Sequence, residues 1–218
     1  KTLPDQKVDV PIYGDSHPLF VFCHGIWGCG TNVWFPFAFT TVAEHDCDFI
    51  SPDCPNPFHP KYEEWKEVLL DRIKMKWNKK QSIILVGHSL GGYTLLRILS
   101  ECYDEDWAKH VKGFYIVSPV VSFTVTPPLP SYDTEINFEP ILKLPIKFRH
   151  IYNIHDETLS PKNSEILRKI MTDGKADYKV EALDTKKYDS HFGGAKHYPV
   201  KEINDGLISL LNEVEKTL

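Results

Sequence analysis

The sequence predicts an α/β protein in which one parallel sheet of about six strands lies between two layers of helices, with little or no cap over it. Short apolar segments alternate along the chain with longer amphipathic segments, which is typical of strands joined by right-handed helical crossovers. The 218 residues include 42% hydrophobic and 25% charged residues, a composition that indicates a globular chain rather than a disordered one. This length fits one folding unit, so we expect residues 1–218 to form a single domain.

Six apolar segments are predicted to be the strands of this sheet. They are short and rich in Val, Ile, Leu or aromatic residues, as strands covered by helices on both faces are. The set comprises residues 19–23, 48–51, 82–86, 113–117, 148–154 and 178–183. Numbering these strands in chain order, we expect the spatial order 2-1-3-4-5-6. Such an order has a switch point between strands 1 and 3, and ligands bind there beyond the carboxyl ends of the strands.

Four segments are predicted to be helices. In residues 62–77 the apolar side chains fall on one stripe, with Lys and Glu side chains opposite, and residues 200–214 also carry one apolar face. A third helix is predicted to begin at Ser160-Pro161, an N-cap followed by a proline in the first turn, and to end near Gly174. Residues 93–99, after the third strand, are compatible with a fourth helix.

The segment 119–145 breaks this alternation, because it has no clean helical or strand period. We expect it to run over one end of the sheet as a small lid or pocket wall. It carries several prolines, among them Pro127, Pro128, Pro130 and Pro140.

The strongest functional signal is Gly87-His88-Ser89-Leu90-Gly91, which joins a predicted buried strand to a predicted helix. A Gly-x-Ser-x-Gly motif in this setting is typical of a nucleophile elbow, a sharp turn that exposes the serine hydroxyl. The glycines leave room for neighbouring backbone, and the N-terminus of the following helix lies beneath the serine. We therefore interpret Ser89 as a nucleophile and the backbone amide of Leu90 as one donor to a developing oxyanion.

A serine nucleophile needs a base and a carboxylate that orients the base, and in this arrangement they follow the serine in the order acid, then histidine. Among ten histidines, His191 follows the last predicted strand and precedes the last helix, so it is the candidate base, with His197 as the alternative. Asp156, in the loop after the fifth strand, is the candidate acid because Leu159 is placed to turn that loop back into the core. Glu157 remains the alternative acid.

The loop after the first strand, His24-Gly25-Ile26-Trp27, suits a second oxyanion donor, and we assign this role to the backbone amide of Ile26. His24 is interpreted as a structural residue of the loop. Trp27 and Trp34 are candidates for substrate binding as part of a pocket wall, although aromatic clusters such as the one around Trp34 more often belong to a core.

No cofactor or metal ion is expected. The same loop contains Gly28-Cys29-Gly30, but Val33 stands where a dinucleotide-binding fingerprint needs its third glycine, and the chain has no Gly-x-x-x-x-Gly-Lys motif. The chain also lacks the His-Glu-x-x-His and Cys-x-x-Cys patterns that are typical of metal sites.

With these residues placed, the chain resembles the small α/β-hydrolases represented by the retinoblastoma-binding protein 9 and YdeN-like family of serine hydrolases. The resemblance extends over nearly the whole chain. Beyond the serine motif it rests on residues 31–36, residues 52–57, Trp65 and Ser190-His191-Phe192. It implies a six-stranded parallel core, little or no cap, and a catalytic triad of Ser89, Asp156 and His191. Two positions depart from the family pattern: His155-Asp156 stands where two adjacent aspartates are common, and Ser190 replaces a glycine.

We therefore expect a serine hydrolase, similar to carboxylesterases, that cleaves small carboxylic esters through an acyl-enzyme. The same residues also suit thioester or peptide hydrolysis. A different alternative is a weakly active or non-catalytic protein of this fold that acts as a protein-binding module, so a protein partner stays open. The net charge of −5 and the short basic tracts disfavour nucleic acid as a partner, and no segment is long and apolar enough to span a bilayer.

The cysteines bear on the compartment. Five cysteines form an odd and scattered set, which favours a reducing, cytoplasmic setting over an oxidised framework. Because the sequence begins at Lys1, earlier removal of a targeting peptide stays open.

Overall fold

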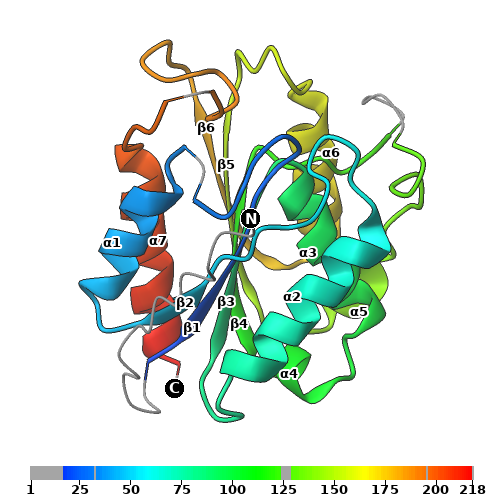
Figure 1. Cartoon of the computed structure of the whole chain (residues 1–218), viewed down its shortest axis with the longest axis vertical. Helices are drawn as coiled ribbons and strands as arrows, with labels where there is room; N and C mark the ends of the chain where they lie inside the picture. Colours follow the sequence, from blue (N-terminus) through cyan, green and yellow to red (C-terminus); the bar gives the residue numbers. More distant parts are fainter. Residues whose placement is uncertain (1–16, 32, 124–128, 195, 218) are drawn as a thin grey trace, which may run out of the picture.

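The computed structural model describes residues 17–31, 33–123, 129–194 and 196–217. Within them lies a six-stranded sheet in the order β2-β1-β3-β4-β5-β6, and every neighbouring pair is parallel (Figure 1). The predicted class and strand order are therefore confirmed. The strands are β1 (Leu19–Cys23), β2 (Asp48–Ile50), β3 (Ile83–His88), β4 (Val111–Val117), β5 (Lys147–Asn153) and β6 (Asp177–Leu183).

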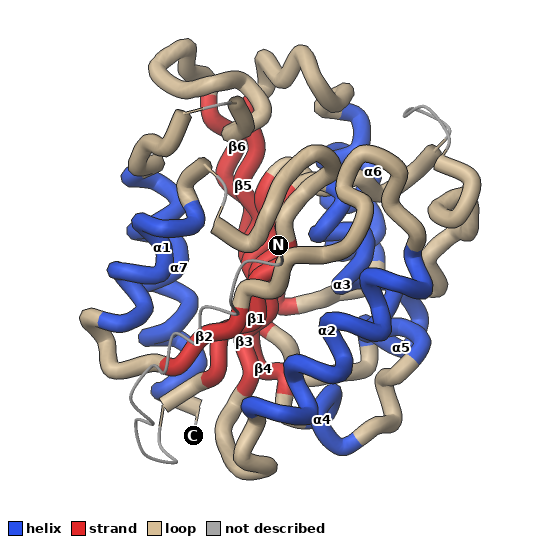
Figure 2. Tube along the Cα trace, in the orientation of Figure 1, coloured by secondary structure: helices blue, strands red, loops and turns tan. Residues whose placement is uncertain are grey.

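Helices cover both faces of the sheet (Figures 1 and 2). Two helices, α1 (Phe35–Ala43) and α7 (Lys201–Glu215), pack side by side on one face. The other face carries α2 (Tyr62–Lys76), α3 (Leu90–Glu101), α4 (Asp106–Lys109), α5 (Phe138–Leu142) and α6 (Lys162–Asp173). None of the helices in the described ranges has the length and apolar character needed to cross a membrane.

The core has two halves because successive strand side chains point to opposite faces. In β1, Leu19 and Val21 pack into the half beneath α2 and α3, whereas Phe20 and Phe22 pack into the half beneath α1 and α7. All residues of β1 and β3 are buried, as expected for central strands covered on both faces. The edge strand β6 is exposed or partly exposed along its whole length.

Three helices, α1, α4 and α5, were not predicted from the pattern. The segment that forms α1 is rich in phenylalanine, which has modest helix propensity, so its sequence indicates only a core aromatic cluster. The helix forms because Phe35, Ala38 and Val42 are spaced to bury one face, and because Pro36 occupies the first turn, where its missing N–H costs little.

Helix α6 begins one residue later than predicted. Pro161, rather than Ser160, is its N-cap residue, and the helix starts at Lys162. Ser160 still supports this start, because its carbonyl accepts a hydrogen bond from the amide of Asn163 at 3.0 Å. Gly174 is the C-cap residue, as predicted, but it has an ordinary negative φ of −76°.

The described part of segment 119–145 packs beside α3. Tyr132 and Ile141 are fully buried in the half of the core beneath α2 and α3, and the hydroxyl of Ser100 donates to the carbonyl of Asn137 at 2.6 Å. This part therefore forms a wall on the α3 side of the sheet. Pro127 and Pro128 lie outside the described residues, and a lid in that region stays a prediction.

Candidate active site

Ser89 occupies the turn between the end of β3 and the start of α3. Its φ of 55° and ψ of −121° place a non-glycine residue in a sparsely populated backbone region. The motif glycines make this turn feasible: a β-carbon on Gly91 would lie 2.1 Å from the carbonyl oxygen of Cys23, and one on Gly87 would lie 2.6 Å from the α-carbon of Gly92. Because the turn packs this closely on the end of β1 and on the first turn of α3, the serine side chain is held just beyond the carboxyl ends of the central strands.

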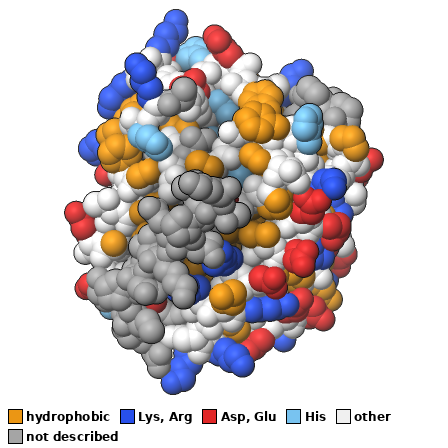
Figure 3. All heavy atoms as spheres, viewed as in Figure 1, with side chains coloured by type: hydrophobic (Ala, Val, Ile, Leu, Met, Phe, Trp, Pro, Cys, Tyr) orange, Lys and Arg blue, Asp and Glu red, His pale blue; other side chains and the backbone are white. Residues whose placement is uncertain are grey.

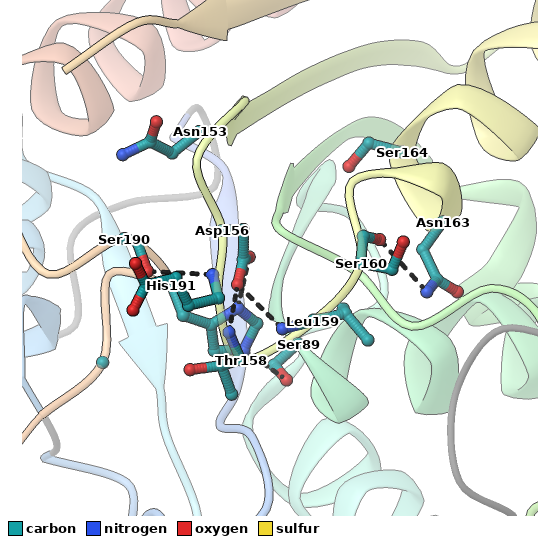
Figure 4. Close-up of polar contacts among 12 residues, drawn as sticks. Ser89, Asn153, Asp156, Thr158, Leu159, Ser160, Asn163, Ser164, Ser190 and His191 are labelled. Carbon is teal, nitrogen blue, oxygen red and sulfur yellow. Dashed lines mark hydrogen bonds and ion pairs between the residues drawn. The ribbon is translucent and has the colours of Figure 1, made fainter.

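A chain of hydrogen bonds links Ser89, His191 and Asp156 (Figure 4). Nε2 of His191 lies 2.8 Å from Oγ of Ser89, and Nδ1 of His191 lies 2.6 Å from Oδ2 of Asp156. The three side chains come from loops after β3, β5 and β6, and all three residues are buried. The structure thus brings together residues that are 102 and 35 positions apart in the sequence.

The second carboxylate oxygen of Asp156 is held by its own loop. Oδ1 accepts hydrogen bonds from the amides of Thr158 at 3.0 Å and of Leu159 at 2.8 Å (Figure 4). Leu159 is buried, so the loop returns to the core at the predicted position. The alternative acid, Glu157, is exposed, and its amide donates to Oγ of Ser190. Of the two neighbouring carboxylates, Asp156 is the one placed against His191.

The loop that carries His191 is a tight turn with several fixed contacts. Oδ1 of Asp189 accepts from the amides of His191 at 3.0 Å and of Gly193 at 3.1 Å. Phe192 has a φ of 54° and is fully buried. The alternative base, His197, is placed elsewhere, with Nδ1 3.2 Å from the carbonyl oxygen of Val33.

His88, the residue before Ser89, also contacts this loop. Its Nε2 lies 2.8 Å from the carbonyl oxygen of His191, and burial together with the nearby His191 lowers the pKa of His88 to about 3. This role of His88 is not predictable from the sequence, since no local signal shows which distant loop a strand-end side chain will reach.

The backbone of the loop after β1 lies against the serine. A β-carbon on Gly25 would be in close contact with the side chain of Ser89, so the loop that carries Ile26 packs directly against the turn that carries the serine. The next two backbone amides already have acceptors in the loops: the amide of Trp27 donates to the carbonyl of Pro57, and the amide of Gly28 donates to the carbonyl of Gly25. The other predicted donor, the amide of Leu90, is the first of α3, and the first amides of a helix have no intrahelical acceptor.

His24 fixes this loop. Its ring is buried, with Nδ1 2.7 Å from the carbonyl oxygen of Gly25, and its Nε2 accepts from the amide of Cys54 at 3.0 Å. With both nitrogens engaged by backbone, His24 ties the loop after β1 to the loop after β2. It has the structural position that was expected from the sequence.

The two candidate tryptophans have different environments. Trp27 is 64% exposed in the loop next to Ser89. Trp34 is fully buried, its ring packed 4.6 Å from that of Phe35 and 6.0 Å from that of His88, centroid to centroid. The structure therefore places Trp34 in the core, beneath α1 and α7, rather than on a substrate-facing surface.

A second exposed aromatic residue, Phe58, was not singled out in the sequence. It is 66% exposed and follows Pro57, whose carbonyl accepts from the amide of Trp27 at 2.8 Å. On the face of the molecule drawn in Figure 3, apolar and histidine side chains gather toward the upper end, whereas acidic and basic side chains mix over α2.

In the described part of the chain, no group of three or more His, Cys, Asp or Glu side chains is arranged to hold a metal ion.

An open parallel sheet with a serine on a strained turn after its third strand is the arrangement of α/β hydrolases. The model of the alpha/beta hydrolase family matches residues 20–191, and the chain belongs to this family. Its members' common activity is hydrolysis, so the chain is assigned as a hydrolase. No curated protein matches the sequence.

Solved structures of similar fold include bacterial proteins. The ydeN gene product from B. subtilis is 19% identical, with a TM-score of 0.68 over 90% of this chain and 99% of that chain. Est1E from Butyrivibrio proteoclasticus, in a structure with bound ferulic acid, is 15% identical, with a TM-score of 0.66 over 92% and 90%. The carboxylesterase Cest-2923 from Lactobacillus plantarum WCFS1 is 13% identical, with a TM-score of 0.56 over 93% and 86%. These likenesses show a shared fold and bear out the YdeN-like resemblance.

Proposed function

We propose that this hydrolase cleaves small carboxylic esters with Ser89 as nucleophile, His191 as general base and acid, and Asp156 as the residue that orients His191. The observation that carries the proposal is the chain of hydrogen bonds from Oγ of Ser89 to Nε2 of His191 at 2.8 Å, and from Nδ1 of His191 to Asp156 at 2.6 Å. A nucleophile in contact with a base that is itself oriented by a third group is the general signature of covalent catalysis by serine.

In the first half-reaction, Oγ of Ser89 attacks the ester carbonyl carbon while Nε2 of His191 accepts the hydroxyl proton. The carbonyl oxygen becomes an oxyanion. The tetrahedral intermediate collapses when His191 returns the proton to the leaving alcohol, which leaves Ser89 as an acyl ester. In the second half-reaction, His191 takes a proton from water as the water oxygen attacks the acyl carbon, and a second tetrahedral intermediate forms. It collapses when His191 gives that proton to Oγ of Ser89, which releases the carboxylic acid and restores the serine hydroxyl and the neutral histidine.

Asp156 keeps His191 in the reactive tautomer. A carboxylate facing Nδ1 holds the proton on that nitrogen, so Nε2 presents its lone pair to Ser89, and the carboxylate stabilises the imidazolium that forms during the reaction. The backbone amides of Thr158 and Leu159 donate hydrogen bonds to the other oxygen of Asp156, and these two hydrogen bonds keep the carboxylate from rotating away from His191.

We assign the oxyanion hole to the backbone amides of Ile26 and Leu90. Support comes from the close packing of Gly25 on Ser89 and from the position of Leu90 at the N-terminus of α3, where the helix dipole also favours negative charge. Trp27, exposed in the same loop as Ile26, is proposed to contact the substrate. None of these steps uses a metal ion or an organic cofactor.

The comparisons favour ester substrates, and the geometry favours catalysis over a non-catalytic role. Similar structures include Est1E with ferulic acid and a carboxylesterase, whose fold this chain shares. A non-catalytic protein-binding module has less support, because such a protein needs no base within 2.8 Å of the serine. Thioester and peptide hydrolysis use the same residues and are separated from ester hydrolysis by the substrate panel below.

The direct test is covalent labelling with a fluorophosphonate probe. We expect the native protein to be labelled at Ser89, as located by peptide mass spectrometry, and the heat-denatured protein to be unlabelled. Ser89→Ala should abolish labelling. Ser118→Ala is a matched control, since Ser118 is also buried with a positive φ of 40°, yet its hydroxyl has no hydrogen-bond partner among the described residues. Labelling that persists in Ser89→Ala, or none in the native protein, overturns the proposal.

The substrate class is tested with p-nitrophenyl esters from acetate to laurate, beside a matched thioester and a peptide anilide. We expect hydrolysis of the esters that is lost in Ser89→Ala, with a preference for one range of acyl length. Faster turnover of the thioester or the anilide would move the proposal to that class while keeping the same residues.

The five cysteines support the further proposal of a reducing, cytoplasmic setting. All five are free in the structure, including the exposed Cys29. Such a set is typical of compartments in which thiols stay reduced.

A further inference from the structure

His88 is the last residue of β3, and its side chain reaches across to the loop after β6. Nε2 of His88 lies 2.8 Å from the carbonyl oxygen of His191, and the two rings pack with centroids 5.1 Å apart. Trp34 packs edge-on against the ring of His88, 6.0 Å away. The residue directly before the nucleophile therefore touches the backbone of the base.

The direction of this hydrogen bond follows from the acceptor. A carbonyl oxygen can only accept, so Nε2 of His88 carries a proton and donates. Because burial and the neighbouring His191 lower the pKa of His88 to about 3, its ring stays neutral and keeps this one donor throughout the neutral pH range. The titratable groups that face it are His191 and, with a weaker effect, His24.

Among the described residues, the other backbone hydrogen bonds of the His191 loop do not involve β3, the strand that leads into Ser89. Asp189 binds amides of its own loop, and Ser190 accepts from the amide of Glu157 in the acid loop. Among the hydrogen bonds of the described residues, the one from His88 is the link between the backbone of His191 and β3.

We propose that His88 is a positioning residue for the reaction: by donating to the carbonyl of His191, it fixes the base at hydrogen-bonding distance from Ser89, its own neighbour in the chain. This inference rests on the proposed function. Ser89 and His191 lie on different loops, so the distance between their side chains depends on the contacts that hold the two loops together. A misplacement of about 1 Å at a reacting pair can cost about 100-fold in rate.

The test compares two phenylalanine substitutions. His88→Phe keeps a ring of similar size but removes the donor. His150→Phe is the matched control: His150 is also a buried histidine on a central strand, β5, its pKa is also lowered to about 3 by burial, and it binds Tyr178 and Ser164 rather than the site. We expect His88→Phe to lower kcat about 10- to 100-fold with KM changed less than about twofold. We expect His150→Phe, measured below its unfolding temperature, to keep kcat.

A conservative pair tests the donor itself. The amide nitrogen of glutamine has about the reach of Nε2 of histidine, whereas that of asparagine has the reach of Nδ1. His88→Gln should therefore restore most of kcat, and His88→Asn should not. This pair also tests the inference if His88→Phe does not fold. Circular dichroism shows the folded fraction of each variant, and kcat of the Gln and Asn variants is then compared per folded protein.

The outcomes separate the inference from the proposed function. An unlabelled native protein in the fluorophosphonate experiment overturns both. If the native protein is labelled and His88→Phe is labelled at the same rate, the inference about His88 is wrong and the role of Ser89 stands. The inference is also wrong if His88→Phe raises KM without lowering kcat, if His150→Phe loses as much kcat, or if the Gln and Asn variants are equally active.

Discussion

Gly25 lies against Ser89 so closely that a β-carbon on Gly25 would stand 2.9 Å from Cβ of Ser89 and 3.4 Å from its Oγ. The loop after β1 and the turn after β3 are therefore in direct contact through a glycine and the candidate nucleophile. Because Ser89 is already strained at a φ of 55°, it has little freedom to yield.

The first prediction is that Gly25→Ala lowers kcat/KM at least about tenfold, because the added methyl group displaces the loop that carries the amide of Ile26. Removing one oxyanion donor in other serine hydrolases costs about 100- to 1000-fold. Gly193→Ala is the matched control, since its added β-carbon would approach nothing closer than 3.6 Å. Steady-state ester hydrolysis measures both variants. Equal activity of the two alanine variants would contradict the prediction.

The second prediction concerns the two neighbouring carboxylates. Asp156→Asn should lower kcat by about 10⁴, because an amide that donates to His191 favours the wrong tautomer. Glu157→Gln should change kcat by less than about threefold, because an exposed side chain away from the reacting groups contributes little. Both are measured at one pH after circular dichroism shows equal folding. The opposite ranking would assign the acid to Glu157.

The third prediction is that acid destabilises the fold. Burial lowers the pKa of His88 and of His150 to about 3, while an unfolded histidine titrates near about 6.5. Between these values the unfolded chain binds more protons than the folded one, so the free energy of unfolding falls as the pH falls below about 6.5. The slope approaches about 1.4 kcal/mol per pH unit for each histidine.

Urea unfolding at several values between about pH 7 and pH 5 measures this slope. His150→Phe should show a smaller loss of stability over that range than the unsubstituted protein, because it removes one of the two groups. An unchanged pH dependence in His150→Phe would show that its protonation does not oppose folding.

The fourth prediction separates the two tryptophans. Trp27→Ala should raise KM about tenfold for the longer acyl esters and change stability by less than about 0.5 kcal/mol, because its ring is exposed. Trp34→Ala should lower the free energy of unfolding by about 3–5 kcal/mol, the usual cost of removing a buried aromatic ring. Met75→Ala is the control for Trp27, since Met75 is 72% exposed on α2. A Trp27→Ala enzyme with unchanged KM for every ester would remove Trp27 from the substrate surface.

The sheet could be predicted because its central strands are buried on both faces and stand out as short apolar segments between amphipathic ones. Helix α1 could not, because Phe35 and its aromatic neighbours fit a strand or a core cluster as well as a helix; their helical spacing acquires meaning only when α7 is packed beside them. The four-residue α4 and five-residue α5 are too short to show a helical period.

The positions of Ser89, Asp156 and His191 followed from their order relative to the strands, since the carboxyl ends of parallel strands share one edge of the sheet. The choice between Asp156 and Glu157 was less certain in the sequence, because it depends on which carboxylate meets the amides of Thr158 and Leu159. The contact of His88 with His191 spans 103 residues and has no local signature. The sequence could not separate a core position from a pocket-wall position for Trp34 for the same reason, since its burial depends on packing against residues distant in the sequence.

The pairing of α1 with α7 also has a consequence for biosynthesis. These helices lie near opposite ends of the described chain, yet they cover the same face of the sheet, with α1 packed on Phe22 of β1 and α7 packed over β4 and β5. A nascent chain that has left the ribosome only as far as β6 therefore exposes the part of this face, over β4 and β5, that α7 covers in the folded protein. Chains in this state are the ones that chaperones retain and that aggregate when translation stalls, so docking of α7 is expected to be the step that releases the protein from them.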